Sequence, residues 1–368
     1  MTRFLRASVV VALGVTLGFL PACSRKQDSG KPRIAIVTNC ADPFWDICAA
    51  GAKQGAKDFG AEVIFRQPDT LATEVQKPII DALVKSPEGL QGLAVSVINP
   101  KAQTEDLKRI GKDIPLVTMD NDAPDSGRLC YVGVDNREAG RALGRLVKKS
   151  LPKGGTIAMF IGDTTSANGE ARSGGVLAEL ATPEKNGVPG KHPDNPQITG
   201  KFYGDYFLLD GEVKEDGGPG TKPLTNAQAA LDRIGGLPNV CMIGLYAYNP
   251  PAILEAARGK SLVGKITILG FDENPITLKA IDEGAIAGTV VQNPYQYGYK
   301  TVEVLVAVHK AKGDKAQIDK ALVKESLPYF VVTKDGVADP KVADKPNEFR
   351  KASEYVVTVE QQLKAGRE

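Results

Sequence analysis

The sequence predicts an α/β protein with two doubly wound parallel-sheet domains joined by a multi-strand hinge. From about residue 32 onward, short apolar, β-branched runs alternate with longer amphipathic segments. That alternation is typical of parallel strands covered by helices on both faces. It starts afresh after Asp135, and the two series have similar lengths. A chain of 368 residues is also long enough for about two domains.

The first series contains expected strands at 33–39, 62–66, 92–97 and 115–119, with helices at 44–59, 71–85 and 102–111. The second contains expected strands at 156–161, 201–208, 240–246, 265–270 and 285–291, with helices at 170–180, 227–234, 253–258 and 276–282. The segments 182–199 and 217–220 are rich in Gly, Pro or Asn, which predicts surface loops.

A long helix at 297–312, a last strand at 329–333 and a closing helix at 355–363 complete the expected elements. Crossovers between the domains are expected near residues 134–136 and just after Gln292. We therefore expect one lobe made of residues 32–134 plus 293–328. The other lobe, with the tail, is expected to comprise residues 135–292 plus 329–368.

Composition excludes several classes of function. Hydrophobic residues make up 42% and charged residues 24% of the chain, an ordinary globular mixture. The net charge of +2 gives no basic excess, so nucleic acid is not an expected partner. With His192 and His309 as the two histidines, histidine-rich metal sites and most histidine-dependent catalysis are disfavoured. We expect no cofactor, no metal and a monomer.

The N-terminus predicts export. Arg3 and Arg6 precede an apolar run at 7–20 that is too short to span a membrane, so residues 1–22 are expected to be a signal peptide. The run ends in Leu-Pro-Ala-Cys23, which resembles a bacterial lipoprotein processing site. That resemblance implies cleavage before Cys23, lipid attachment to its thiol and anchoring on the periplasmic side of a membrane. Residues 23–31 would form a tether. A plain secretory signal is the alternative, and it also leads out of the cytoplasm.

Four further cysteines leave the disulfide question open. They are Cys40, Cys48, Cys130 and Cys241. Disulfides are permitted in an oxidising compartment, and four cysteines allow three pairings. Buried free thiols are an equal expectation.

Polar and aromatic residues gather where the expected strands end, which is where ligands bind in open α/β sheets. The candidate ligand-binding residues are Asn39, Asp42, Phe44, Trp45, Asp120, Asn121, Arg172, Asn249, Asp272 and Gln292. Carboxylates and amides suit vicinal hydroxyls, arginine donates in a fixed fork, and aromatic faces cover the apolar face of a sugar ring. No nucleophile stands beside a base, so no catalytic residue is assigned. The set favours a neutral polyol, above all a sugar.

These motifs resemble those of the type I periplasmic sugar-binding proteins of the ribose-binding class, the receptor components of ABC importers. The landmarks, in order, are Asp42-Pro-Phe-Trp45, Thr118-Met-Asp120, Val132-Gly-Val-Asp135-Asn136, Asn168-x3-Arg172-x2-Gly175, Asn249, Gly270-Phe-Asp272 and Ala287-Gly-Thr-Val-Val-Gln292. The resemblance runs from about residue 32 to residue 332. It implies two lobes that close around a monosaccharide, and delivery of that sugar to an ABC permease.

The resemblance also implies a role for each residue. Asp42 and Asp120 would accept hydroxyl protons and Arg172 would donate. Asn249, Asp272 and Gln292 would complete the hydrogen-bonding shell, and Phe44 and Trp45 would form an aromatic wall. Asn39 and Asn121 are further members. Two departures cast doubt on ribose itself, because Asn121 stands where ribose binders carry arginine and Asp42 replaces their asparagine. The opposite aromatic is not defined, with Tyr206, Tyr246 and Tyr248 as candidates.

Structural alternatives stand beside these roles. Asp42 is a possible N-cap of the first helix, with Pro43 at its first position, and Asp272 a possible cap of the helix near Pro275. Phe44 and Trp45 could be ordinary core residues. Alternative functions are a sugar sensor for a chemoreceptor or kinase, a transcription regulator of the same fold and a secreted glycosidase with paired carboxylates. We expect no enzymatic activity.

Overall fold

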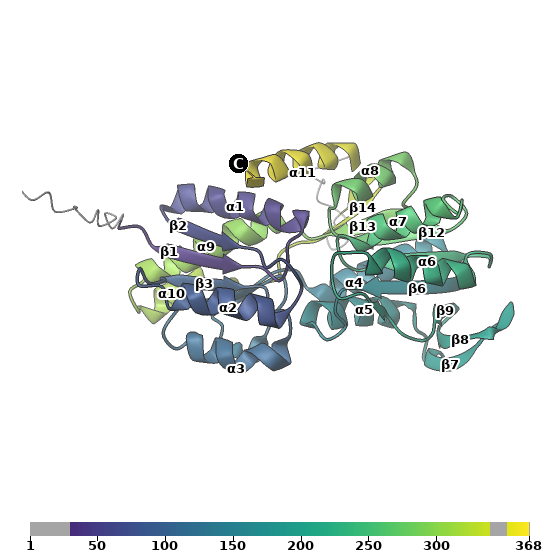
Figure 1. Ribbon diagram of the computed structural model, residues 1–368, viewed down its shortest axis with the longest axis horizontal. Helices are drawn as coiled ribbons and strands as arrows, with labels where there is room; N and C mark the ends of the chain where they lie inside the picture. Colours follow the sequence, from purple (N-terminus) through teal and green to yellow (C-terminus); the bar gives the residue numbers. More distant parts are fainter. Residues whose placement is uncertain (1–29, 339–351, 368) are drawn as a thin grey trace, which may run out of the picture. The chain divides into compact units, whose positions relative to one another are not determined.

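The computed structural model describes residues 30–338 and 352–367 of the chain. It contains two separate β-sheets with helices packed around each (Figure 1). This confirms the predicted α/β class with two lobes. The expected signal peptide and Cys23 lie outside the described residues. No helix within the described ranges is long and apolar enough to cross a membrane.

The first lobe is built on a five-stranded parallel sheet of order β2-β1-β3-β4-β5. Its strands are β1 (Arg33–Val37), β2 (Glu62–Arg66), β3 (Gly92–Val95), β4 (Leu116–Met119) and β5 (Tyr131–Val132). The elements around it are α1 (Pro43–Phe59), α2 (Thr73–Val84), α3 (Pro100–Ile110), the short 3-10 helix η1 (Pro124–Ser126), α9 (Pro294–Lys310) and α10 (Lys315–Ala321). Strands β3 and β4 are buried throughout, as expected for a sheet covered on both faces.

The second lobe is built on a ten-stranded mixed sheet of order β15-β14-β13-β12-β11-β6-β9-β8-β7, with β10 also paired to β6. Its strands are β6 (Gly155–Ile161), β7 (Asn186–His192), β8 (Asn195–Tyr203), β9 (Tyr206–Leu209), β10 (Lys214–Glu215), β11 (Val240–Gly244), β12 (Thr267–Phe271), β13 (Gly288–Val291), β14 (Phe330–Thr333) and β15 (Gly336–Ala338). Its helices are α4 (Asn136–Ser150), α5 (Ala167–Leu180), α6 (Lys222–Ile234), α7 (Asn249–Gly259) and α8 (Pro275–Glu283), and α11 (Ala352–Arg367) packs against both lobes.

Two expectations for the second lobe are wrong. The segment 182–199, expected to be a loop, supplies β7 and the start of the antiparallel strand β8. The expected strand at 201–208 is divided between β8 and β9, which pair with each other across a tight turn. The first error follows from the character of β7. Strand β7 is an edge strand with mostly exposed side chains, and its pairing with β8 is irregular, so the sequence lacks the apolar alternation that normally marks a strand.

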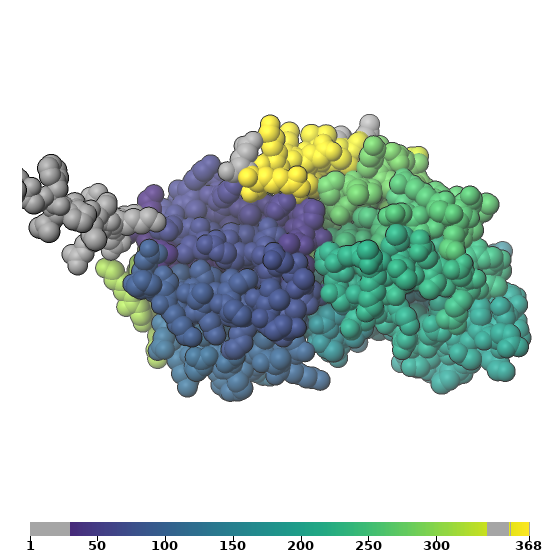
Figure 2. Space-filling view, in the orientation of Figure 1, coloured from purple at the N-terminus to yellow at the C-terminus, as the bar shows by residue number. Residues whose placement is uncertain are grey.

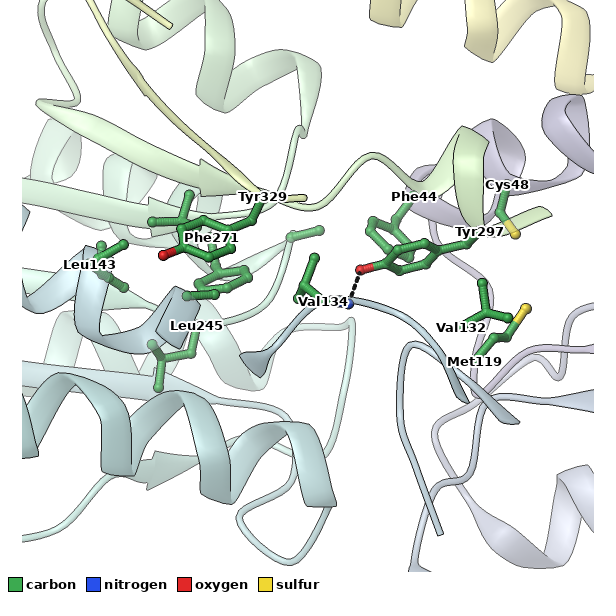
Figure 3. Close-up of a cluster of buried hydrophobic side chains, with 14 of the residues drawn as sticks. Phe44, Cys48, Met119, Val132, Val134, Leu143, Leu245, Phe271, Tyr297 and Tyr329 are labelled. Atoms are coloured by element: carbon green, nitrogen blue, oxygen red, sulfur yellow. Dashed lines mark hydrogen bonds between the residues drawn. The ribbon is translucent and has the colours of Figure 1, made fainter. Parts of the chain in front are cut away.

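The chain passes between the lobes in three places, after β5, after β13 and between α10 and β14. The first and third segments pair with each other, because the Leu327 N–H donates to the Gly133 carbonyl oxygen at 2.8 Å. Buried side chains from both lobes meet around these segments, and the Val134 N–H donates to the Tyr297 hydroxyl at 3.2 Å (Figure 3). The connection between the lobes is therefore a packed hinge.

The four described cysteines, Cys40, Cys48, Cys130 and Cys241, are all buried free thiols. Burial raises the pKa of each thiol, so these groups stay protonated and unreactive. The sequence left disulfides and free thiols open as alternatives, and in the structure these four cysteines are free thiols.

Candidate functional site: a pocket between the two lobes

A single pocket brings together residues from the ends of several strands in both lobes. Its first-lobe lining is Asn39, Cys40, Asp42, Phe44, Trp45, Leu71 and Asp120, and its second-lobe lining is Asn168, Arg172, Tyr246, Ala247, Tyr248 and Asp272. The pocket encloses about 400 Å³ of empty space, part of it open to solvent. Seven of the ten predicted ligand residues line it.

The entry to α1 supplies one wall. Asp42 is the N-cap of this helix and accepts a hydrogen bond from the Phe44 N–H at 2.9 Å, with Pro43 at the first helical position. The cap fixes the first turn, which directs Phe44 and Trp45 to the pocket. The two rings contact edge to face at 4.9 Å. The Trp45 indole N–H donates to Asn39 at 3.0 Å, which fixes the orientation of the ring. Asp42 thus caps α1 and also lines the pocket, and Phe44 and Trp45 are buried and also line it.

Asp120 and Asp272 occupy equivalent positions in the two lobes. Each follows directly on a strand, β4 or β12, and each has a positive φ, 60° for Asp120 and 70° for Asp272. Such left-handed backbone is uncommon outside glycine, and Asp and Asn tolerate it best. The left-handed residue ends the strand, and in both lobes its carboxylate lines the pocket. The Ser96 hydroxyl donates to Asp120 at 3.0 Å and the Gln292 amide to Asp272 at 2.5 Å.

Arg172 connects the two carboxylates. Its guanidinium lies 3.7 Å from Asp120 and 3.8 Å from Asp272, and it is 1% exposed. The Nε–H donates to Asn136 at 2.8 Å and Nη1 donates to the Leu245 carbonyl oxygen at 3.0 Å. The Phe271 ring covers one face of the guanidinium at 4.1 Å. Nη2 is buried and has no hydrogen-bond partner among the described residues. A buried donor without an acceptor is costly, which suggests that a ligand oxygen completes it.

Close packing of α4 against α5 holds Arg172 in place. A Cβ atom on Gly140 would lie 2.2 Å from the Arg172 carbonyl oxygen, so only glycine fits at this crossing. The short distance between the helices brings the arginine within reach of Asn136 at the start of α4. Gly140 thus permits the close helix packing that positions Arg172.

Charge in the pocket is predominantly negative. Burial raises the pKa of Asp120 to about 6, against the lowering effect of Arg172, and burial also raises the pKa of Asp42 to about 6. Burial likewise raises the pKa of Asp272, and Arg172 again opposes it. Three carboxyl groups, those of Asp42, Asp120 and Asp272, therefore line the pocket beside one guanidinium, the single basic side chain among the described residues of the lining. Such a site accepts hydrogen bonds from hydroxyl groups and repels anions.

Tyr246 and Tyr248 form the aromatic wall of the second lobe. The Tyr246 hydroxyl is held by Ser166 at 2.7 Å and donates to Asn168 at 2.9 Å. The Tyr248 hydroxyl donates to Asp216 at 2.8 Å. Tyr206, the third candidate, lies elsewhere, since its hydroxyl donates to the Leu151 carbonyl oxygen in the core. Of the three tyrosines, Tyr246 and Tyr248 line the same pocket as Phe44 and Trp45.

Three predicted residues lie outside the lining and contact residues that form it. The Asn121 side-chain oxygen accepts a bond from the Asn168 N–H at 2.9 Å. Asn249 accepts from the Tyr246 N–H at 3.0 Å and donates to Asp216 at 2.7 Å. Gln292 donates to Asp272.

The lining also contains residues that the sequence did not single out as ligand residues. They are Cys40, Leu71, Asn168 and Ala247. Asn168 opens the motif that ends in Arg172, and its position one turn before the arginine on α5 was the available signal. The other three contribute apolar surface, for which strand-end polarity gives no signal.

The alternative role of Asp272 as a helix cap is wrong. Asn274 caps α8 by accepting a bond from the Ile276 N–H at 2.9 Å. No group of three or more His, Cys, Asp or Glu side chains in the described ranges is arranged to hold a metal ion.

Two lobes around an interlobe pocket define the class of the extracytoplasmic solute-binding proteins, and sequence comparison agrees. The family profile described as periplasmic binding protein domain matches residues 34–314. The chain belongs to this family, whose members are substrate-binding proteins that act outside the cytoplasm.

Individual relatives are distant but match over most of their length. The ribose import binding protein of Escherichia coli is 23% identical over 288 residues, which cover 77% of this chain and 85% of the relative. The D-allose-binding periplasmic protein of the same organism is 24% identical over 310 residues, which cover 81% of this chain and 90% of the relative. A solute-binding protein of an ABC transporter from Burkholderia graminis, solved in complex with D-arabinose, has a TM-score of 0.69 at 25% identity and covers 86% of this chain and 98% of its own.

Proposed function

We propose that this protein captures a neutral monosaccharide or related polyol between its lobes and delivers it to an ABC permease. The observation that carries the proposal is the meeting of Asp120, Arg172 and Asp272 in one pocket, with an aromatic wall on each side. Carboxylates accept from hydroxyls, the unpartnered Nη2 donates to a ring or hydroxyl oxygen, and the rings cover the apolar face of a sugar. The relatives named for ribose and allose binding, and the similar structure solved in complex with D-arabinose, support the same ligand class.

We propose that the mechanism is closure of a hinge without chemical change to the ligand. The ligand contacts groups of both lobes and therefore favours the closed arrangement over the open one. The first lobe comprises residues 32–134 plus 293–328. The second lobe, with the tail, comprises residues 135–292 plus 329–368. Three further residues affect the ligand indirectly, through their hydrogen bonds to residues of the pocket lining: Asn121, Asn249 and Gln292. The protein is a monomer that is exported by residues 1–22 and anchored by lipid on Cys23.

A thermal-shift screen tests the ligand class. Neutral aldoses, alditols, nucleosides and the uronic acids of the same aldoses are added to the purified protein at millimolar concentration. We expect at least one neutral sugar to raise the melting temperature, and its uronic acid to raise it less because three carboxylates line the pocket. Stabilisation by nucleosides or uronic acids alone would contradict the proposal.

A further inference from the structure

The C-terminal helix α11 covers both lobes and lies beyond the part of the chain that matches the family profile, which ends at residue 314. It packs along α1 of the first lobe and α8 of the second. In Figures 1 and 2 the yellow helix lies against both the purple and the green parts of the chain. Tyr355, Val359 and Leu363 recur every four residues and are all buried, so α11 presents one continuous face to the protein.

One end of the helix is attached to the first lobe. The Lys53 ammonium of α1 donates to the carbonyl oxygens of Ala365 and Gly366, at 3.4 and 3.0 Å. Arg367 pairs with Asp46 at 3.2 Å. A Cβ atom on Gly366 would lie 1.9 Å from the Asp46 carbonyl oxygen, so the glycine permits direct backbone contact with α1. A lysine at the last carbonyls of a helix is also favoured by the helix dipole.

The other end is attached to the linker between the lobes through a buried acid. Tyr355 and Glu273 are both buried and lie beside each other, and Glu273 is 2% exposed. The same carboxylate accepts from the Asn293 N–H at 3.1 Å and from the Gln292 N–H at 3.3 Å. These two residues form the segment in which the chain leaves β13 and enters α9 of the first lobe. Glu273 therefore holds the backbone of a hinge segment, and Tyr355 of α11 packs beside Glu273.

The same segment reaches the pocket. The Gln292 side chain donates to Asp272 at 2.5 Å and accepts from the Tyr297 hydroxyl at 3.0 Å. Asp272 in turn faces Arg172 at 3.8 Å. A shift of the Gln292 backbone would move an amide that fixes the Asp272 carboxylate, and so would alter the wall that meets the ligand.

We propose that Tyr355 is a positioning residue for the ligand site and that α11 restrains the hinge, a role that rests on the proposed function. Because the helix is attached to the first lobe at one end and to the linker at the other, a change of angle between the lobes must break contacts at one end. Loss of either attachment widens the range of interlobe arrangements. A smaller fraction of the protein is then competent to bind, and the apparent affinity falls.

A double-mutant cycle on binding tests the positioning role. Tyr355→Phe keeps the ring and removes the hydroxyl, and Glu273→Gln alters the carboxyl group beside it. We expect each variant to bind sugar about three- to tenfold more weakly in calorimetry, the effect of about one hydrogen bond. The double variant should be no weaker than the weaker single one, since both act through one contact. Val357→Ala, at an exposed position of the same helix, is the matched control. Unchanged affinity in Tyr355→Phe, or additive losses, would overturn the role.

A distance measurement without ligand tests the restraint. Spin labels at Glu105→Cys and Asp205→Cys, two exposed positions in different lobes, report the interlobe distance. Gly366→Val should broaden its distribution, whereas Gly259→Val, at a glycine with open space around it, should not. Identical distributions in both variants would overturn the restraint. Because this measurement needs no sugar, it stands apart from the proposed function, which fails if the wild-type protein binds no sugar in calorimetry.

Discussion

The Arg172 guanidinium lies 3.7 Å from the Asp120 carboxylate, and the two residues belong to different lobes. Arg172 projects from α5 of the second lobe, whereas Asp120 follows β4 of the first. The hydrogen bond from the Asn168 N–H to Asn121 joins the same two edges at 2.9 Å. The contacts that form the pocket are thus also contacts between the lobes, so a ligand bound here acts on the hinge.

Replacement of Arg172 should abolish most of the binding. Arg172→Ala removes the donor Nη2 and leaves Asp120 and Asp272 without their shared cation. Because a hydrogen bond to a charged group contributes about 1.5–3 kcal/mol, we expect sugar affinity to fall by at least about tenfold in calorimetry. Arg141→Ala, in a partly exposed ion pair on α4, is the control and should bind normally. Equal affinities of Arg172→Ala and wild type would remove this residue from the site.

Binding should weaken in acid. The pKa of Asp42 and that of Asp120 are raised to about 6 by burial, and sugar hydroxyls donate best to the ionised carboxylates. Below pH 6 a proton must leave before the bond forms, so affinity should fall by up to about tenfold per pH unit for each group. Asp120→Asn should reduce this slope. A flat affinity between pH 5 and pH 7.5 would show that neither carboxylate accepts from the ligand.

The contribution of Asp120 to the stability of the free protein should change with pH in the opposite direction. The folded-state pKa of Asp120 lies above its ordinary value of 3.8, so the folded state favours the protonated acid. Its stabilising contribution is full below pH 3.8 and is lost as the pH rises to about 6. Denaturant unfolding of wild type and Asp120→Asn over this range isolates the contribution. A free-energy difference between them that does not change with pH would contradict the assignment.

Trp45 provides a direct optical signal. It is the single tryptophan of the sequence and lines the pocket. Sugar binding should therefore change the intrinsic tryptophan emission in proportion to occupancy. Trp45→Phe should lose this signal and bind more weakly by about threefold to tenfold, because the smaller ring covers less of the sugar and lacks the N–H bonded to Asn39. An emission spectrum that stays constant during a titration with a sugar that calorimetry shows to bind would place the ligand away from Trp45.

The proposed lipid anchor requires the thiol of Cys23. Cys23→Ser should transfer the protein from the membrane fraction to the soluble extracytoplasmic fraction, because the acyl chains can no longer be attached. Fractionation followed by immunoblotting measures the distribution. Membrane association that persists in Cys23→Ser would favour a plain secretory signal with another means of attachment.

The sequence predicted the fold because its central strands are buried runs flanked by amphipathic helices. Strand ends were equally informative, since Asp120 and Asp272 directly follow buried strands and their carboxylates line the pocket. The hairpin β7–β8 escaped prediction because edge strands with exposed side chains carry little hydrophobic signal.

The prediction of the site residues was incomplete for a different reason than the prediction of the strands. Asn249 and Gln292 stand at strand ends like the lining residues, but their side chains bond to Tyr246, Asp216 and Asp272 instead. Which polar group faces a ligand and which supports its neighbour depends on side-chain rotamers and hydrogen bonds, which periodicity does not encode. Tyr355 and Glu273 lie beside each other in the structure but far apart in the sequence, and no sequence motif predicts that they meet.

A crystal structure of the protein with its bound sugar tests the central claim most directly. We expect one sugar between Trp45 and Tyr246, hydrogen-bonded to Asp120, Asp272 and the Nη2 of Arg172. A sugar bound elsewhere, or an interlobe pocket that stays empty at saturating sugar concentration, would contradict it.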